Sequence, residues 1–145
     1  MSMDEPDEAP ADELRAWARG MLPLEAATEL LIRGGFAQTW RPWVRWDADA
    51  NRHWIAFASI PDEIGGMSGG QGRFLRIAAS IGGDVPVILG DEIPGLDRTY
   101  LTLVLSAVSH ACGAHETGRT VDFVDGQPKI VPLPPLNAWA SETRS

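Results

Sequence analysis

The first half of the chain carries a segment whose apolar and polar positions follow the pattern of a β-hairpin. Residues 43–46 and 53–57 are rich in aromatic and β-branched side chains. The residues between them, 47–52, are mostly polar and break the apolar pattern. This arrangement predicts two short strands joined by a loop within residues 42–60.

A second hairpin is predicted near the end of the chain. Residues 120–124 and 129–133 contain several β-branched residues and flank Asp125-Gly126-Gln127-Pro128, a turn sequence. Three prolines lie within residues 132–135. Because proline lacks a backbone N–H, they exclude a further central strand in that stretch.

Three longer segments repeat apolar residues at helical intervals: residues 24–33, 68–81 and 98–112. Pro23 suits the first turn of a helix, and Ser68 and Asp97 suit N-cap positions. A shorter helix is expected over residues 13–20. The apolar run at residues 85–89 is expected to form a buried strand or extended segment.

The last of these helices has the clearest apolar face. Its apolar residues recur at positions i, i+3, i+4, i+7 and i+11: Leu101, Val104, Leu105, Val108 and Cys112. A face of this kind is typical of a helix that packs on a core. These side chains are therefore expected to be buried.

The charge of the chain is concentrated at its beginning. The formal net charge is −8, and six of the 20 acidic residues precede Arg15, the first basic residue. The other 14 nearly balance the 12 basic residues, so binding to nucleic acid and mimicry of DNA are not favoured. We expect residues 1–12 to form a disordered acidic tail and residues 13–145 a single α+β domain, in which three helices pack on a small antiparallel hairpin sheet.

Composition also bears on the compartment. Cys112 is the only cysteine, so an internal disulfide is excluded. No apolar run approaches the roughly 20 residues that span a bilayer, and no basic segment precedes an apolar one at the N-terminus. We expect a cytoplasmic protein with no membrane association. Eleven arginines against one lysine, with many alanines and glycines, resemble the composition of small actinobacterial proteins.

Residues 67–97 carry the most specific motif of the chain. Ser68-Gly69-Gly70-Gln71 opens a predicted helix, an apolar run precedes Asp91-Glu92, and Leu96-Asp97 follows. This order resembles the signature loop, the acidic pair and the following loop of ABC-type ATPases. The resemblance implies that residues 68–71 bind the γ-phosphate of a nucleotide through backbone N–H groups across a dimer. It matches Asp91 to the metal-associated aspartate and Glu92 to the catalytic glutamate of that family.

The phosphate-binding loop of such ATPases does not occur in this sequence. No Gly-rich segment with Gly-Lys-Ser/Thr is present, and Lys129, the only lysine, follows a turn. Phe74 and Ile93 replace an arginine and a proline of the family pattern. The resemblance therefore implies a degenerate ABC-like module that contacts nucleotide when another chain supplies the loop. The alternative interpretation of residues 68–71 is a capping box at a helix start.

Tryptophans and arginines cluster around the first hairpin: Trp40, Arg41, Trp43, Arg45, Trp46, Arg52 and Trp54. An exposed surface of this kind stacks bases or anchors a partner protein, whereas buried tryptophans fill a core. Because side chains alternate along a strand, Trp43 and Arg45 are expected to face solvent and Trp46 the core. The candidate binding residues are Trp43, Arg45, Arg52, Ser68, Gly69, Gly70 and Gln71.

No catalytic or metal site is predicted. His110, Cys112 and His115 have a spacing compatible with metal ligands, but zinc requires four ligands and Cys112 is expected to be buried. The sequence shows no Ser/His/Asp order, pair of catalytic carboxylates or dinucleotide-binding glycine pattern. We therefore expect no cofactor.

The sequence favours a small non-enzymatic protein that acts through a protein–protein surface, with regulation as one possible role. The expected partner is another protein. Two alternatives stay open: the ABC-like module described above, and binding of single-stranded nucleic acid by the Trp/Arg hairpin.

Overall fold

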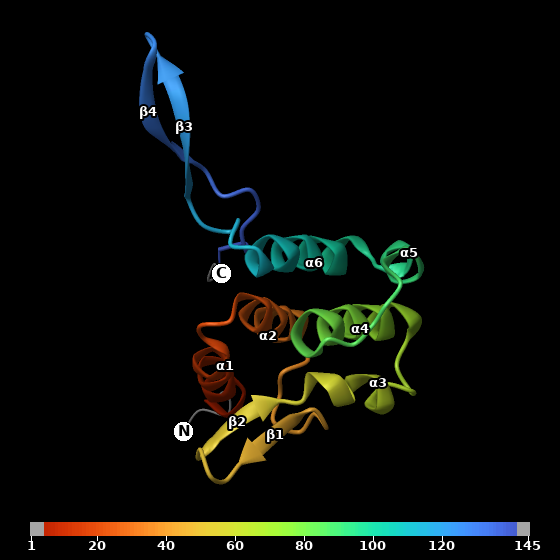
Figure 1. Ribbon diagram of the computed structural model, residues 1–145. Helices are drawn as coiled ribbons and strands as arrows, with labels where there is room; N and C mark the ends of the chain where they lie inside the picture. Colours follow the sequence, from red (N-terminus) through yellow and green to blue (C-terminus); the bar gives the residue numbers. More distant parts are fainter. Residues whose placement is uncertain (1–4, 142–145) are drawn as a thin grey trace.

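The computed structural model describes residues 5–141, with the side chains of residues 10–141 (Figure 1). Four longer helices are present: α1 (Glu5–Ala18), α2 (Leu22–Gly34), α4 (Gly69–Gly83) and α6 (Arg98–Ala111). The short helical elements are η1 (Phe57–Ser59), α3 (Ile60–Glu63), α5 (Leu89–Glu92) and η2 (Ile93–Gly95). The strands are β1 (Val44–Asp47), β2 (Arg52–Ile55), β3 (Gly118–Val124) and β4 (Gln127–Leu133). The predicted α+β class is confirmed, whereas the prediction of three helices on one hairpin sheet is wrong.

Helix α2 occupies the centre of the body. It packs against α1, α4 and α6, and Figure 1 shows α6 on one side of it and the β1–β2 hairpin with α3 on the other. Pro23 stands in its first turn, and Gly35 ends it in a left-handed conformation with φ 87°. The buried residues of α2 are Ala26, Ala27, Thr28, Leu30 and Leu31.

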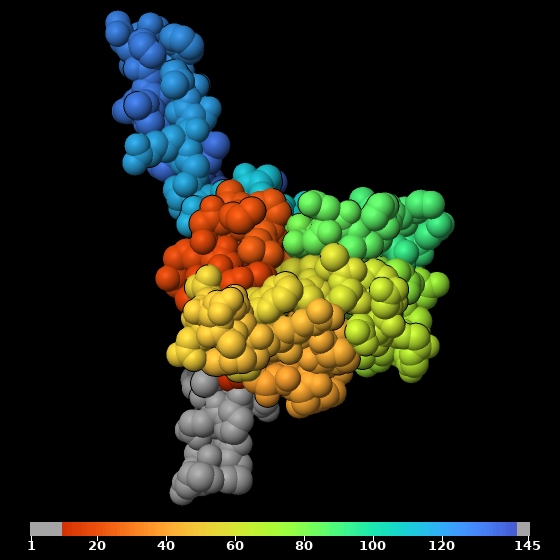
Figure 2. Space-filling view, turned by 60° about the horizontal axis from the view of Figure 1, so that its bottom comes forward, coloured from red at the N-terminus to blue at the C-terminus, as the bar shows by residue number. Residues whose placement is uncertain are grey.

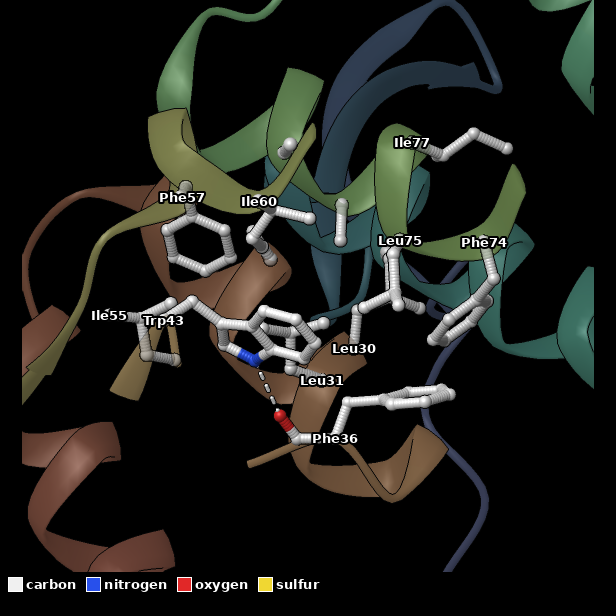
Figure 3. Packing of buried hydrophobic residues seen from close by; sticks show 14 of the residues in the cluster. Leu30, Leu31, Phe36, Trp43, Ile55, Phe57, Ile60, Phe74, Leu75 and Ile77 are labelled. Carbon is white, nitrogen blue, oxygen red and sulfur yellow. Dashed lines mark hydrogen bonds between the residues drawn. The ribbon is translucent and has the colours of Figure 1, made fainter. Parts of the chain in front are cut away.

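The hydrophobic core gathers around Trp43, whose side chain is fully buried. Its indole Nε1 donates a hydrogen bond of 2.8 Å to the carbonyl oxygen of Phe36, so its polar atom is satisfied inside the core. Figure 3 shows the surrounding side chains, which come from α2, β2, η1, α3 and α4: Leu30, Leu31, Ile55, Phe57, Ile60 and Leu75.

The predicted orientation of the hairpin tryptophans is wrong. Trp43 is fully buried and Trp46 is 52% exposed, the reverse of the expectation. Strand β1 begins at Val44, so Trp43 lies just before the strand, where alternation does not fix the direction of a side chain. Trp46 pairs with His53 near the outer end of the hairpin, where its ring meets the imidazole edge-on at 4.9 Å.

Helix α1 begins within the segment predicted to be an acidic tail. It covers residues 5–12 of that segment, and Pro10 is buried. The start of the folded region predicted at residue 13 therefore does not coincide with the beginning of the helix. Residues 1–4 lie outside the described part of the chain, and their disorder stays a prediction.

The apolar run at residues 85–89 does not form the predicted strand. Residues 85–88 connect α4 to α5 without pairing to any strand of the described chain, and Leu89 is the first residue of α5. Pro86 removes one backbone donor from this stretch, which weakens its ability to join a sheet.

A carboxylate of α2 links three parts of the molecule. Glu29 accepts from Arg15 Nε of α1 at 2.9 Å and from Arg33 Nε at 2.6 Å. Arg33 in turn donates through Nη1 to the carbonyl oxygen of Ala140 at 2.8 Å, near the end of the chain. Burial acts to raise the pKa of Glu29, but the hydrogen bonds from both arginines outweigh it and hold that pKa below its ordinary value of 4.5.

The core role of Trp43 is tested by a pair of substitutions. Trp43→Ala is expected to lower the free energy of unfolding by about 3–5 kcal/mol, because it leaves a cavity that the core cannot fill. Trp46→Ala is expected to cost at most about 0.5–1 kcal/mol, since half of this side chain is already in water. Urea denaturation followed by circular dichroism measures both values. Equal losses in the two variants would show that Trp43 does not anchor the core.

The link at Glu29 makes the stability depend on pH. A carboxylate with a depressed pKa in the folded state adds stability that is complete above its unfolded pKa and is lost as the pH falls through the folded value. Glu29→Gln is therefore expected to lower the Tm at pH 7, and its deficit relative to the unchanged protein should shrink between about pH 5 and pH 3. Differential scanning calorimetry across this range checks the trend. A deficit that stays the same at both ends would contradict it.

Candidate functional site

The apolar face predicted to bury α6 is only partly covered, since Val104 is buried and Leu101 is half-buried. Leu105 and Val108 are 50% and 56% exposed, and Cys112 is exposed as well. The buried side of α6 consists largely of small and polar residues: Val104, Ser106, Ala107, Ser109 and His110. Small side chains allow α6 to lie close to α2, so the helix packs through a side that shares Val104 with the predicted apolar face but otherwise differs from it.

Further apolar side chains extend this exposed face toward α5. Ile88, Leu89 and Ile93 are 68%, 54% and 38% exposed. A groove of about 290 Å³ runs between α4, α5 and α6 beside them, and Val104 and Val108 are among its lining residues. We call this region the α5–α6 surface. Contiguous exposed apolar area of this kind is a feature of interaction sites.

The β3–β4 hairpin stands away from the body. Figure 1 shows it as an extension beyond the C-terminal end of α6, and Figure 2 shows from another side that it adjoins the body only at its base. Its strand residues are exposed except for Gly118 and Val131, which are half-buried. We call residues 118–133 the arm. The arm and the α5–α6 surface lie toward opposite ends of α6.

The two faces of the arm differ in polarity, most clearly at its middle. The register places Val121 opposite Ile130 and Phe123 opposite Pro128, and Pro132 continues the same face opposite Arg119. The exposed fractions of Val121, Phe123 and Ile130 are 59%, 70% and 67%. The other face is polar at its middle, where Asp122 opposes Lys129, and mixed toward its ends, where Val124 opposes Gln127 and Val131 opposes Thr120. In folded proteins the apolar face of such a sheet is normally covered, but here it is open to solvent.

The turn of the arm follows from its sequence. Asp125 and Gly126 have φ values of 54° and 78°, as a two-residue type I′ turn requires. Glycine adopts this conformation without a steric penalty, and aspartate tolerates it. The prediction of a second hairpin is confirmed, with strands that extend beyond the predicted limits.

The body holds both ends of the arm. Before the arm, Gly113 ends α6 with φ 84°, and the carbonyl oxygen of Ala114 accepts from the backbone N–H of Leu136, which follows the arm, at 2.8 Å. The Ser106 hydroxyl then donates toward Asn137 Oδ1 at 3.0 Å. These bonds fix the point at which the arm leaves the body.

A histidine on α6 completes this anchorage. Trp139 Nε1 donates to His110 Nδ1 at 2.9 Å, and His110 Nε2 lies 2.9 Å from Glu25 Oε1. Because an indole N–H only donates, His110 accepts at Nδ1 and presents its own N–H to Glu25. This hydrogen bond, together with one from the Gly20 backbone N–H, lowers the pKa of Glu25 below 4.5. The polar face of α6 therefore ties the C-terminal segment to α2.

Residues 68–71 form a capped helix start. Ser68 Oγ accepts from the Gln71 backbone N–H at 3.3 Å. Ser68 and Gly69 are exposed, and Gly70 and Gln71 are half-buried. Anion binding by this loop, which the ABC resemblance implies, stays a prediction.

The acidic pair of the motif lies in a helix and not at the end of a strand. Asp91 and Glu92 belong to α5. Glu92 is engaged by Arg76 of α4, whose Nη2 lies 3.0 Å and whose Nε lies 3.1 Å from its Oε1. Glu92 therefore ties α5 to α4.

The remaining predicted binding residues do not form one surface. Arg45 and Arg52 are exposed and lie on the same face of the β1–β2 hairpin, because Arg45 pairs with Trp54 and Arg52 with Asp47. Trp46 lies on the opposite face, and Trp43 is buried. The structure thus does not bring the exposed tryptophan of this hairpin and its two arginines together.

The candidate metal residues have other contacts. The rings of His110 and His115 stack with their centres 3.9 Å apart, and the exposed Cys112 donates from Sγ to the Ser109 carbonyl oxygen. Among the side chains described, those of residues 10–141, no group of three or more histidine, cysteine or acidic residues is placed to hold a metal ion. No helix in the described chain has the length and apolar character needed to span a membrane.

Comparisons of the chain with protein-family models, with curated proteins and with solved structures gave no match. The arm and the α5–α6 surface are therefore interpreted from their own geometry. The sequence carried a signal for the arm, since runs rich in apolar and β-branched residues flank the Asp125-Gly126 turn. It carried none for the exposure of that face, which depends on where the rest of the chain lies.

The helix caps of the motif region give a test of its structural role. Ser68→Ala and Asp97→Ala are each expected to lower the free energy of unfolding by about 0.5–2 kcal/mol. Asp97 should lie at the upper end, because its charged Oδ1 accepts from the Tyr100 N–H at 2.7 Å whereas the Ser68 bond measures 3.3 Å. Chemical denaturation compares the two. Unchanged midpoints in both variants would contradict the capping interpretation.

Proposed function

We propose that this chain is a small non-enzymatic protein that acts by binding another protein chain, and that the arm is its principal contact surface. The observation that carries the proposal is the continuous apolar face of the arm, which no other part of the described chain covers. Each of Val121, Phe123 and Ile130 would contribute about 1.5–3 kcal/mol if fully buried. In this proposal a binding partner covers these three side chains.

The construction of the arm favours this role. A two-stranded hairpin is marginally stable by itself in water, and this one adds nothing to the hydrophobic core. The chain nevertheless fixes both of its ends through the bonds of Leu136 and Trp139. A segment that is anchored at its base and apolar on one face is suited to insertion between or alongside elements of a partner. The α5–α6 surface supplies a second apolar area for contact.

The charged residues around a concavity between α1, α2 and α6 favour a non-enzymatic role. A pocket of about 270 Å³ between α1, α2 and α6 is lined by Glu25, Glu29 and His110, among others. Glu25 is bound to His110, and Glu29 is bound to Arg15 and Arg33. Both ring nitrogens of His110 are already engaged, so the imidazole has no free position for proton transfer to a substrate. These groups serve the packing of helices.

A photoreactive residue in the arm tests the proposal. Replacing Phe123 by the photo-cross-linking analogue benzoylphenylalanine is expected to give covalent adducts on irradiation in cells that produce the chain, because this side chain would lie in the contact. The matched control carries the analogue at Asp122, on the polar face, and should give few adducts. Gel electrophoresis and mass spectrometry identify the products. Absence of adducts at position 123, or equal yields at both positions, would contradict the proposal.

A further inference from the structure

The two edges of the arm differ in their capacity to form hydrogen bonds. A two-residue type I′ turn makes Val124 and Gln127 a hydrogen-bonded pair, and hydrogen-bonded and non-hydrogen-bonded pairs then alternate along the hairpin. The pairs whose backbone groups point outward are therefore Phe123 with Pro128, Val121 with Ile130, and Arg119 with Pro132.

Proline closes one edge and leaves the other open. On β4, two of the three outward positions are Pro128 and Pro132, which have no N–H to offer. On β3, the outward positions are Arg119, Val121 and Phe123, each with a backbone donor and acceptor.

One side-chain contact confirms that the backbone N–H of Phe123 points outward from the hairpin. The N–H of Phe123 bonds to the neighbouring Asp122 carboxylate at 2.8 Å, so it points away from β4. The bond is local and solvent-exposed. An added strand would replace it, so β3 is the edge at which the sheet can be extended.

We infer that the occupant of this edge is the β3 strand of a second copy of the chain, in antiparallel orientation about a two-fold axis at Val121. The inference rests on the proposed function and names its partner. Val121 would pair with Val121 of the second copy, and Arg119 with Phe123 of the second copy. The two hairpins would form one sheet in the order β4-β3-β3-β4, with a proline-bearing strand at each outer edge.

A second copy of β3 is a geometrically complete partner for this edge. The outward residues Arg119 and Phe123 lie two positions on either side of Val121, so a two-fold rotation brings every outward donor of one strand opposite an outward acceptor of the other. The same rotation, about an axis perpendicular to the sheet, keeps both apolar faces on one side. It also places the Arg119 guanidinium beside the Phe123 ring of the other copy, a favourable cation–π arrangement.

Charge does not oppose this contact. The net charge of −8 belongs largely to the beginning of the chain and not to the arm. The arm itself carries two basic and two acidic residues: Arg119, Lys129, Asp122 and Asp125. Repulsion between the bodies is screened beyond roughly 10 Å at 0.1 M ionic strength. A contact made by the arms alone is smaller than the roughly 800 Å² per partner of standard interfaces, so we expect a reversible dimer whose population depends on concentration.

A matched pair of proline substitutions tests the edge assignment in the full chain. Val121→Pro and Ile130→Pro each replace a β-branched residue of the same apolar face at an outward N–H, so neither removes a hydrogen bond within the hairpin. Only Val121→Pro blocks the open edge. In sedimentation velocity over a concentration series, the unchanged chain and Ile130→Pro should form dimers, whereas Val121→Pro should raise the dimer Kd at least about tenfold. A monomeric unchanged chain, or equal weakening in both variants, would overturn the inference.

A cross-linking experiment gives an independent answer if proline disturbs the arm. In a Cys112→Ser background, Val121→Cys should oxidise to a disulfide-linked dimer, because residues opposite each other in a hydrogen-bonded pair have Cα atoms about 5.5 Å apart. Ile130→Cys, on the far strand, should stay reduced under the same mild oxidant. Cross-linking at position 130 but not 121 would overturn the arrangement.

The two proposals fail in different ways. Adducts at position 123 that contain only a different protein, together with a monomeric chain, would overturn the second-copy inference and support the proposed function. A lack of adducts with any protein would overturn both.

Discussion

The structure depends on helix α2 being engaged on opposite sides by different kinds of interaction. Its apolar side, with Leu30 and Leu31, closes the core around Trp43. Its charged side carries Glu25, Glu29 and Arg33, which bond to α6, α1 and the C-terminal segment respectively. Because each of these carboxylates is partly or largely buried, an unpaired one would cost more than its pairing contributes. The position of α2 therefore determines where α6 ends, where the chain returns, and in which direction the arm leaves the body.

Local chemistry made part of this fold predictable. Both hairpins follow from short runs of β-branched and aromatic residues and from turn residues, and the caps at Ser68 and Asp97 follow from side chains that bond to the backbone three residues away. The face of α6 was not predictable in the same way. Hydrophobic spacing shows that Leu105 and Val108 share a side of the helix, but it does not show whether the cover comes from the same chain or from another. Ser106 and Ala107 are small enough for close helix packing, but only the tertiary structure shows that α6 packs on the body through them.

The candidate site was likewise predictable from the sequence only in its local features. Residues 68–71 were singled out by a motif, and the structure gives them a local role as a helix cap. Strand alternation assigned Trp43 to the surface. This residue precedes β1, and its indole N–H donates to the Phe36 carbonyl oxygen inside the core. The arm was seen as a hairpin but not as a surface, because exposure is a property of the whole molecule. Residues that are far apart in sequence, such as His110 and Trp139, decide that property through one hydrogen bond.

The prolines of β4 also set a limit on growth. A hairpin with two open edges would add strands indefinitely, which is the geometry of fibrils. Pro128 and Pro132 remove most donors from one edge, so each molecule has a single edge at which a sheet can lengthen. Once that edge is occupied, no further strand finds a complete set of partners. The two prolines therefore leave the exposed apolar hairpin with one strand-accepting edge, which disfavours growth into a fibril.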